Sequence, residues 1–192
     1  MSTLVVVKKG DEVAIAADSL SSYGSTRLAA EFDANPEKIF SANGSFVGAV
    51  GSAAHGLVLE SVLTREDLGL SFQNRQEIFR SFLKLHPVLK KEFFLLTEED
   101  EDKAPYESSQ FDLLIANASG IYGVHSLREV YEYSRFWATG SGWKYALGAM
   151  TTVYEGTASA EEIARIGVEA GSQFDQGSGL PCQSVSLKLA TS

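Results

Sequence analysis

The sequence has little of what several common classes of protein require. Among its 192 residues Cys182 is the sole cysteine, so a disulfide within the chain is excluded. No apolar run is long enough to cross a bilayer and the first residues do not resemble a secretory signal, so we expect a cytoplasmic protein without membrane contact. Basic residues are also scarce, with 16 Lys and Arg against 25 Asp and Glu, and the net charge of −9 would repel nucleic acid.

Several signatures of cofactor and metal enzymes are absent as well. The chain contains no Walker A loop, no GxGxxG, no HExxH and no CxxC, and it lacks the GxSxG turn of many serine hydrolases. Its three histidines, His55, His86 and His125, fall on different predicted elements rather than in a ligand cluster. We therefore expect neither a metal nor an organic cofactor.

What is present is an ordinary globular composition, 44% hydrophobic and 21% charged. The length predicts a single domain over residues 1–192 with a full core. An acidic inserted loop around residues 97–110 carries six carboxylates against one lysine, which is more than half of the net charge. A charge run of this kind is most simply a solvated loop. Alternatively it is an acidic collar that favours basic or neutral polypeptides over acidic ones.

Strand patterns occupy the first fifty residues and return later. Residues 4–7 and 13–17 are apolar on consecutive positions, which is typical of strands covered on both faces. Residues 38–40 and 46–50 flank Asn43-Gly44, a strong hairpin signal. Residues 111–116 and 121–124 predict a second hairpin, and short strands are expected at 136–138 and 182–189.

Helical periodicity separates these strand regions. Residues 53–63 and 75–94 are predicted to be helices, the second with Ile78, Phe79, Phe82, Leu85 and Leu89 on one face. Two more are expected over 143–154 and after Ser159, where Glu162 completes a capping-box pattern. The order strands, two helices, strands, two helices, strand predicts an α+β fold, a four-layer αββα sandwich of two antiparallel sheets between helix layers.

The beginning of the sequence offers one chemical possibility. Met1 is readily removed before a small residue such as Ser2, and removal leaves a hydroxyl and a free α-amine on the same residue. Because an α-amine has a pKa of about 7.7–8.0, it can act as general base for its own hydroxyl. Many proteins begin Met-Ser, so this feature is uninformative without further pattern.

That further pattern is an ordered set of polar and glycine positions. Asp18 ends the second strand, Lys38 opens the third and Gly51 follows a strand. Thr139-Gly140-Ser141-Gly142 precedes a helix, and Asp175-Gln176-Gly177-Ser178-Gly179 follows one. In this order, over nearly the whole chain, they resemble the proteasome β-type family of N-terminal nucleophile (Ntn) hydrolases, which includes HslV. The serine start and the acidic insertion look more like the betaproteobacterial proteasome homologue (BPH) branch.

The resemblance implies a function and roles for named residues. It implies a self-compartmentalised peptidase in which Ser2 replaces the family's threonine nucleophile and attacks a peptide carbonyl. Lys38 would favour the alkoxide and the unprotonated amine, and Asp18 would keep Lys38 charged and oriented. The Gly51 N–H would donate to the tetrahedral oxyanion, a contact that can contribute about 3 kcal/mol.

The remaining roles support this centre. Ser141 would hydrogen-bond around the Ser2 amine, with Asp175 and Ser178 holding that network from behind. The S1 pocket would draw on Ala49, Ala53 and Phe40, where the small Ala49 suggests a roomy, apolar site. Taken singly, each of these residues could serve a structural purpose, for example as a turn, an edge lysine or a helix N-cap.

The resemblance also implies an assembly. Head-to-tail contacts that close into rings would give a homo-oligomeric double ring with internal active sites, and rings of roughly six or seven subunits both satisfy closure. No feature of the sequence assigns an AAA+ unfoldase partner, so we expect peptides or unfolded chains as substrates. Two alternatives stay open, a small-molecule amidase of the same chemistry and a catalytically silent ring scaffold.

Overall fold

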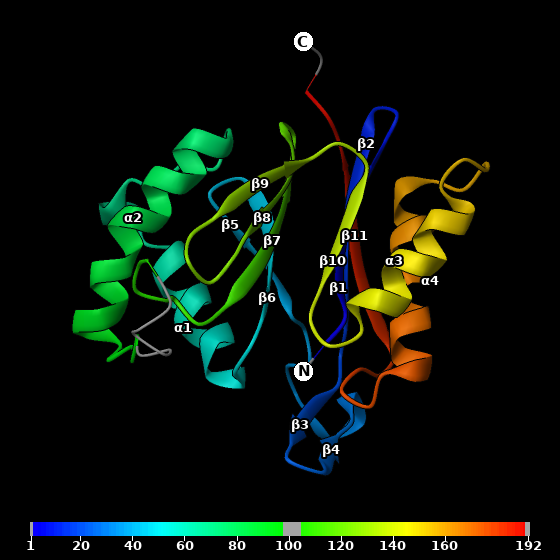
Figure 1. Cartoon of the computed structure of the whole chain (residues 1–192), viewed down its shortest axis with the longest axis horizontal. Helices are drawn as coiled ribbons and strands as arrows, with labels where there is room; N and C mark the ends of the chain where they lie inside the picture. The colour runs from blue at the N-terminus through cyan, green and yellow to red at the C-terminus, as the bar shows by residue number, and fades with distance from the viewer. Residues whose placement is uncertain (1, 98–104, 191–192) are drawn as a thin grey trace.

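The computed structural model describes residues 2–97 and 105–190, which fold into four layers. One helix layer, two sheets and a second helix layer lie side by side from left to right in Figure 1. The elements are β1 Leu4–Lys9, β2 Glu12–Asp18, β3 Ser21–Tyr23, β4 Thr26–Leu28, β5 Ile39–Ala42, β6 Ser45–Val50, α1 Ala53–Leu63, α2 Arg75–Glu92, β7 Asp112–Asn117, β8 Gly120–Val124, β9 Val130–Tyr133, β10 Phe136–Thr139, α3 Trp143–Val153, α4 Ala160–Phe174 and β11 Cys182–Lys188, with short 3₁₀ turns at Ala30–Phe32 and Glu66–Leu68. This αββα order confirms the fold class predicted from the sequence.

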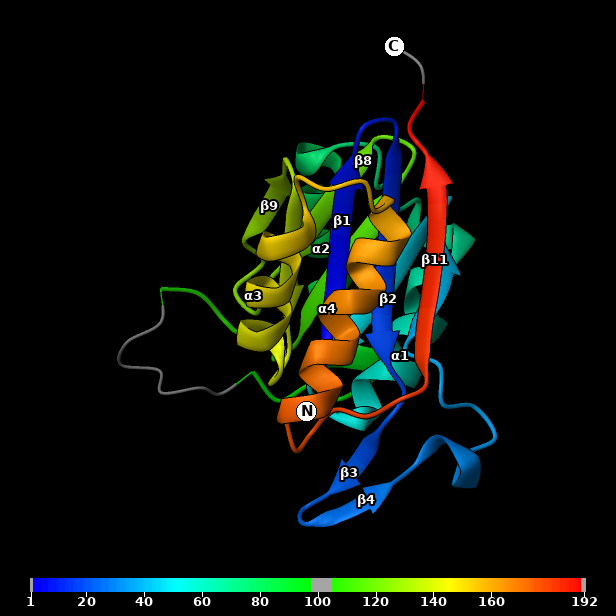
Figure 2. The same cartoon turned by 90° about the vertical axis from the view of Figure 1, so that its right-hand side faces the viewer.

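The first sheet runs in the order β10-β1-β2-β11 and is antiparallel throughout. Its central strands turn at Gly10 and Asp11, and Leu4 pairs with Ala17. Helices α3 and α4 cover its outer face (Figure 2). The predicted capping box opens α4, because Ser159 Oγ accepts from the Glu162 N–H and the Glu162 carboxylate accepts from the Ser159 N–H.

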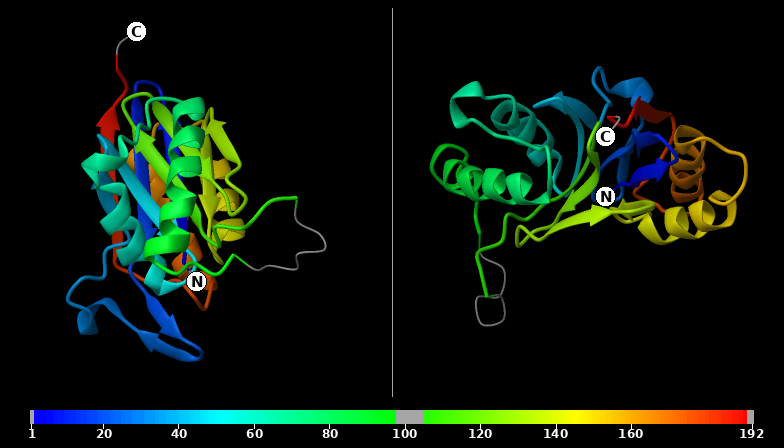
Figure 3. Two further views of the ribbon diagram at one scale, coloured as in Figure 1. Left: turned by 90° about the vertical axis from the view of Figure 1, so that its left-hand side faces the viewer. Right: turned by 90° about the horizontal axis from the view of Figure 1, so that it is seen from above.

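The second sheet has the antiparallel order β5-β6-β7-β8-β9. Asn43 and Gly44 form its first hairpin with φ of 49° and 69°, the left-handed conformation that Asn and Gly adopt at low cost. Helices α1 and α2 lie on the outer side of this sheet, as the view from above in Figure 3 shows. Asn74 caps α2 by accepting from the N–H groups of Gln76 and Glu77.

Alternation along the central strands explains why both sheets are apolar on both faces. In β1, Leu4 and Val6 pack between the sheets, whereas Val5 and Val7 pack under α3 and α4. All four are almost completely buried. Consecutive strand side chains point to opposite faces, so a strand covered on both sides must be apolar at every position.

Some elements differ from the sequence expectation. The β3–β4 hairpin and β9 were not predicted, since each is only three or four residues long and carries no sustained alternation. Phe79 was expected on the buried face of α2 but is 44% exposed, because the packed stripe consists of Ile78, Phe82, Leu85 and Leu89. The helix ends at Glu92 rather than at residue 94. Within residues 2–97 and 105–190, no helix combines the length and apolarity needed to span a membrane.

Candidate active site

Ser2 lies just before β1. The N-terminus of the chain is at the end of the molecule from which the β3–β4 hairpin projects (Figure 1). Its carbonyl oxygen accepts from the Gly142 N–H at 3.2 Å. The next residue, Thr3, donates its backbone N–H to Asp18 Oδ1 at 2.9 Å. Two neighbouring peptide groups are thus tied to different elements, and the position of the Ser2 side chain follows from them.

Asp18 is the last residue of β2 and is completely buried. Besides Thr3, the backbone N–H groups of Leu20 and Gly179 donate to its Oδ2, each at 3.0 Å. Lys38 Nζ donates to Oδ1 at 2.9 Å and supplies the opposite charge. A buried carboxylate is costly unless it is paired and hydrogen-bonded, and this one has both kinds of partner.

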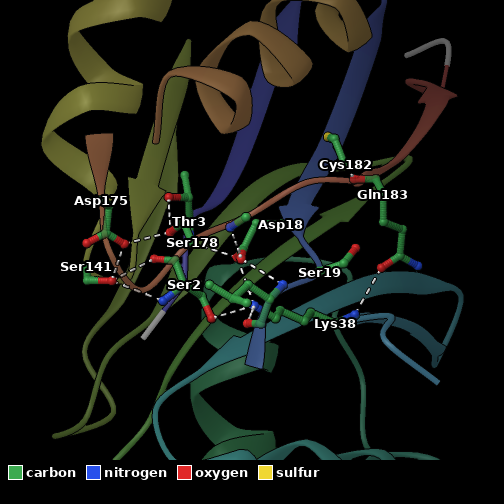
Figure 4. Close-up of polar contacts among 12 residues, drawn as sticks. Ser2, Thr3, Asp18, Ser19, Lys38, Ser141, Asp175, Ser178, Cys182 and Gln183 are labelled. Carbon is green, nitrogen blue, oxygen red and sulfur yellow. Dashed lines mark hydrogen bonds and ion pairs between the residues drawn. The ribbon is translucent and has the colours of Figure 1, made fainter. Parts of the chain in front are cut away.

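Lys38 stands immediately before β5 and brings its ammonium to the nucleophile. Its Nζ lies 3.0 Å from Ser2 Oγ and also donates to the Leu20 carbonyl at 2.6 Å (Figure 4). Burial lowers the pKa of the Lys38 ammonium, and the nearby Asp18 carboxylate partly offsets that change. The side chain of Gln183 holds this segment, because its Oε1 accepts from the N–H groups of Lys38 and Ile39.

A second group of polar side chains meets the backbone nitrogen of Ser2. The Ser2 nitrogen donates to Ser141 Oγ at 3.2 Å, and Ser141 Oγ donates to Asp175 Oδ2 at 2.6 Å (Figure 4). Ser178 Oγ donates to the same carboxylate oxygen at 2.7 Å and lies 2.7 Å from Thr3 Oγ1. These side chains come from the turns before α3 and after α4, so the two helices bring them together.

Two glycines shape the site because a side chain is disfavoured at both positions. Gly140 has a φ of +90°, and a Cβ there would lie 2.1 Å from the Ser2 carbonyl oxygen. Gly51 has a φ of +138°, and a Cβ there would lie 3.1 Å from His55 Nδ1. Both conformations are ones that residues with a side chain rarely adopt. Gly140 therefore permits the close approach that seats Ser2.

A hollow of about 880 Å³ opens beside Ser2 and is also lined by Lys38 and Gly51. The three residues expected in a substrate pocket, Phe40, Ala49 and Ala53, all line it. The walls are more polar than the expected apolar pocket, since the carboxylate residues Asp33, Glu37 and Glu60 are also part of them.

The structure thus brings all seven residues of the expected catalytic set into one region, while Met1 and residues 98–104 of the acidic loop lie outside the described residues. Sequence reasoning missed Thr3, Gly140 and Gln183. Gly140 carried a usable signal within the Gly-Ser-Gly turn, but nothing in the sequence marks Thr3 or Gln183. Over residues 2–97 and 105–190 there is no group of three or more His, Cys, Asp or Glu able to hold a metal ion.

Comparison with solved structures finds similar chains of full length. Two structures of Thiobacillus denitrificans BPH match, one solved in complex with epoxomicin. That structure is 38% identical with a TM-score of 0.90, covering 98% of this chain and 100% of its own. The other is 39% identical with a TM-score of 0.93, covering 99% of this chain and 100% of its own.

Eukaryotic HslV from Trypanosoma brucei is 20% identical with a TM-score of 0.69 and shares the fold, covering 97% of this chain and 99% of its own. No protein-family model and no curated protein matches the sequence. The identity to BPH over the full length, together with the proteasome-like architecture, supports a proteasome-like Ntn peptidase. The chain belongs to the BPH family of HslV-like, proteasome β-type proteins.

Proposed function

We propose that the protein is a peptidase whose nucleophile is Ser2, exposed as the N-terminal residue when Met1 is removed. One observation carries this proposal. The hydroxyl and the backbone nitrogen of Ser2 are held by different partners, Lys38 Nζ at 3.0 Å and Ser141 Oγ at 3.2 Å. An N-terminal nucleophile needs both atoms positioned independently, because one attacks while the other carries the proton.

Acylation begins when the α-amine of Ser2 accepts the proton of its own Oγ. The oxygen then forms a bond to the carbonyl carbon of the substrate, and the backbone N–H of Gly51 donates to the resulting oxyanion. Breaking the C–N bond releases an amine that takes the proton back from the Ser2 ammonium. An acyl ester remains on Oγ, and a water molecule hydrolyses it by the same proton route.

Lys38 and Asp18 set the electrostatics of these steps. The ammonium donates to Ser2 Oγ, so it stabilises the oxygen as negative charge develops there. A neighbouring positive charge also favours the neutral, proton-accepting form of the α-amine. Asp18, fully buried, fixes the ammonium in place.

Ser141, Asp175 and Ser178 orient the amine. Because Ser141 Oγ donates to Asp175, its lone pairs face the Ser2 nitrogen and accept from it. Ser178 holds the other side of the same carboxylate oxygen and keeps it aligned. These residues do not touch the scissile bond, and we assign them a positioning role.

The family and the hollow both support the proposed substrate class. A hollow of about 880 Å³ beside the nucleophile accommodates several residues of an extended chain. Peptides and unfolded polypeptides are therefore the expected substrates, and Phe40, Ala49 and Ala53 would contact the residue on the acyl side. Assembly into a homo-oligomeric double ring would enclose this site. We assign no residue to the binding of an unfoldase partner.

Intact mass before and after treatment with a peptide epoxyketone tests the proposal. This inhibitor closes a stable ring with a hydroxyl and a free amine on the same residue, so only a true N-terminal nucleophile retains it. We expect a mass lacking Met1 that gains one inhibitor. Epoxomicin, bound in the structure of the related BPH, serves as a second probe.

Two substitutions complete the test. Ser2→Ala should abolish peptide hydrolysis and inhibitor uptake, because the attacking oxygen is gone. Ser2→Thr should retain activity, since its hydroxyl and amine are the same and its methyl only restricts χ1. A chain that keeps Met1 and gains no inhibitor would instead be a silent ring scaffold, and hydrolysis of small amides without turnover of unfolded protein would indicate an amidase.

A further inference from the structure

A second hollow, of about 670 Å³, lies beside the first and shares Val50 and Gly51 with it. Ser2 lines the first hollow, and Ser141 lines the second. Gly51, whose N–H the proposed mechanism assigns to the oxyanion, therefore belongs to the walls of both hollows. If the scissile peptide bond of a substrate lies at this point, the parts of the substrate on its two sides lie over different hollows.

The proton route determines which half lies where. The leaving nitrogen must take a proton from the α-amine of Ser2, and the nitrogen of Ser2 faces Ser141 at 3.2 Å. The hydroxyl of Ser2 faces Lys38 in the first hollow. The acyl half of the substrate therefore lies on the Lys38 side, and the amine half extends into the second hollow.

Three strand ends place a carboxylate in this second hollow. Asp112 begins β7, His125 follows β8 and Thr139 ends β10. Asp112 Oδ1 lies 3.2 Å from His125 Nδ1, and its Oδ2 accepts from Thr139 Oγ1 at 3.3 Å. Asp112 is the one carboxylate among the described residues that line the hollow, and neither Lys nor Arg lines it. Its side chain remains 36% exposed, so a substrate can reach it.

His125, when protonated, offsets the negative charge of the Asp112 carboxylate. The Asp112 carboxylate raises the pKa of His125, while Tyr133 Oη lies 3.2 Å from its Nε2. Glu129 adds a smaller charge effect in the same direction. When His125 is neutral, the lining has a net negative charge.

Two indoles stand in the same walls. Trp137 stacks on Tyr133 at 5.3 Å between ring centroids, which holds it in place, and Trp143 is the first residue of α3. They are 36% and 39% exposed. Indole faces attract cations. Lys144 already lies 5.5 Å from the centroid of the Trp143 ring, so it opposes the binding of another cation there.

We infer that this second hollow, with Asp112 and the two indoles, selects a cationic side chain, Arg or Lys, on the amine side of the scissile bond. The inference rests on the proposed function, because it requires Ser2 to be the nucleophile. It assigns Asp112 as a specificity residue that contacts the leaving half of the substrate and takes no part in the bond-making steps.

A pair of internally quenched peptides tests this assignment. The two peptides share the acyl half and differ after the scissile bond only by arginine against citrulline, which has nearly the same shape without the charge. We expect the wild-type kcat/KM to favour arginine by about fivefold, the upper range for a partly exposed ion pair. Asp112→Asn should lower the ratio, leaving only the weaker preference that the two indoles supply, whereas Lys144→Gln should raise it.

The ratio separates specificity from damage to the fold, because a merely structural defect lowers turnover of both peptides equally. Equal turnover of the two peptides by the wild type would overturn the inference alone. A ratio for Asp112→Asn that equals the wild-type ratio would overturn it too. If neither peptide is cut and no epoxyketone adduct forms, the proposed function fails, and the inference fails with it.

Discussion

The two atoms of Ser2 that would perform the chemistry have very different surroundings. On the hydroxyl side stands an ion pair, Lys38 with the fully buried Asp18, supported by three backbone N–H donors. On the nitrogen side stands a chain of hydroxyls that ends at Asp175. The buried pair holds charge at one place, and the hydroxyl chain orients a nitrogen that must gain and lose a proton. The contrast predicts that damage to the first side costs both fold and activity, and damage to the second costs mainly activity.

Asp18→Asn should have the largest effect. It leaves the Lys38 ammonium without its counter-charge and gives three backbone N–H donors one acceptor fewer, which should destabilise the protein by about 3–5 kcal/mol and abolish hydrolysis. Denaturant unfolding and peptide turnover measure the two effects. Asp11→Asn is the control, since it removes an exposed partner of Lys188 and should leave the unfolding midpoint unchanged. Equal midpoints for the two variants would contradict the assigned role of Asp18.

Gly140→Ala should come next, because a Cβ would meet the Ser2 carbonyl oxygen and force the nucleophile to shift. We expect a loss of kcat of about 100-fold, in line with the cost of a 1 Å misplacement in an active site. Gly24→Ala is a matched control, with a φ of +60° and no atom within 4 Å of its Cβ. The Gly24→Ala substitution introduces backbone strain without a steric clash, so the kcat of this variant should stay near that of the wild type. Similar kcat losses in both variants would refute the idea that Gly140 seats Ser2.

Ser141→Ala should have an intermediate effect confined to the chemical step. Without the Ser141 hydroxyl the amine loses its orienting partner but keeps its basicity, so we expect kcat to fall about 10- to 100-fold, at or below the range of a full general base. KM and the unfolding midpoint should stay at their wild-type values. Thr152→Ala is the control, because it also removes a hydroxyl, one that donates to the Ala149 carbonyl within helix α3. A rise in KM with constant kcat would place Ser141 in substrate binding instead.

The pH profile should show the smallest of these effects. Burial lowers the pKa of Lys38 below the ordinary 10.5, with Asp18 opposing part of the change. The ammonium is charged below its pKa, so activity that needs the charge falls as pH rises through that lowered value. The alkaline limb of kcat/KM should therefore lie below pH 10.5. If kcat/KM begins to fall only at or above pH 10.5, the reaction does not require a charged Lys38.

Much of the fold was predictable because local patterns and tertiary packing agree. Helix α1 begins and ends at the predicted residues, and the capping box at Ser159 and the hairpin at Asn43-Gly44 both formed. Continuous apolar runs in β1 and β2 correctly indicated sheets covered on both faces. The short strands β3, β4 and β9 could not be predicted from the sequence. Pairing with a neighbouring strand, rather than a pattern of side chains, determines them.

The candidate site divides in the same way. The sequence by itself determined the kinds of residue available and their order, from Ser2 through Asp18, Lys38 and Ser141 to Asp175, and that order pointed to the family. Only the tertiary structure decided that Thr3 would bridge Asp18 and Ser178, that Gly140 would press against Ser2 and that Gln183 would hold the Lys38 segment. The reason is physical: periodicity records which face of an element is buried, whereas contacts between residues far apart in the sequence, such as Thr3 with Ser178 and Lys38 with Gln183, exist only once the elements have packed together.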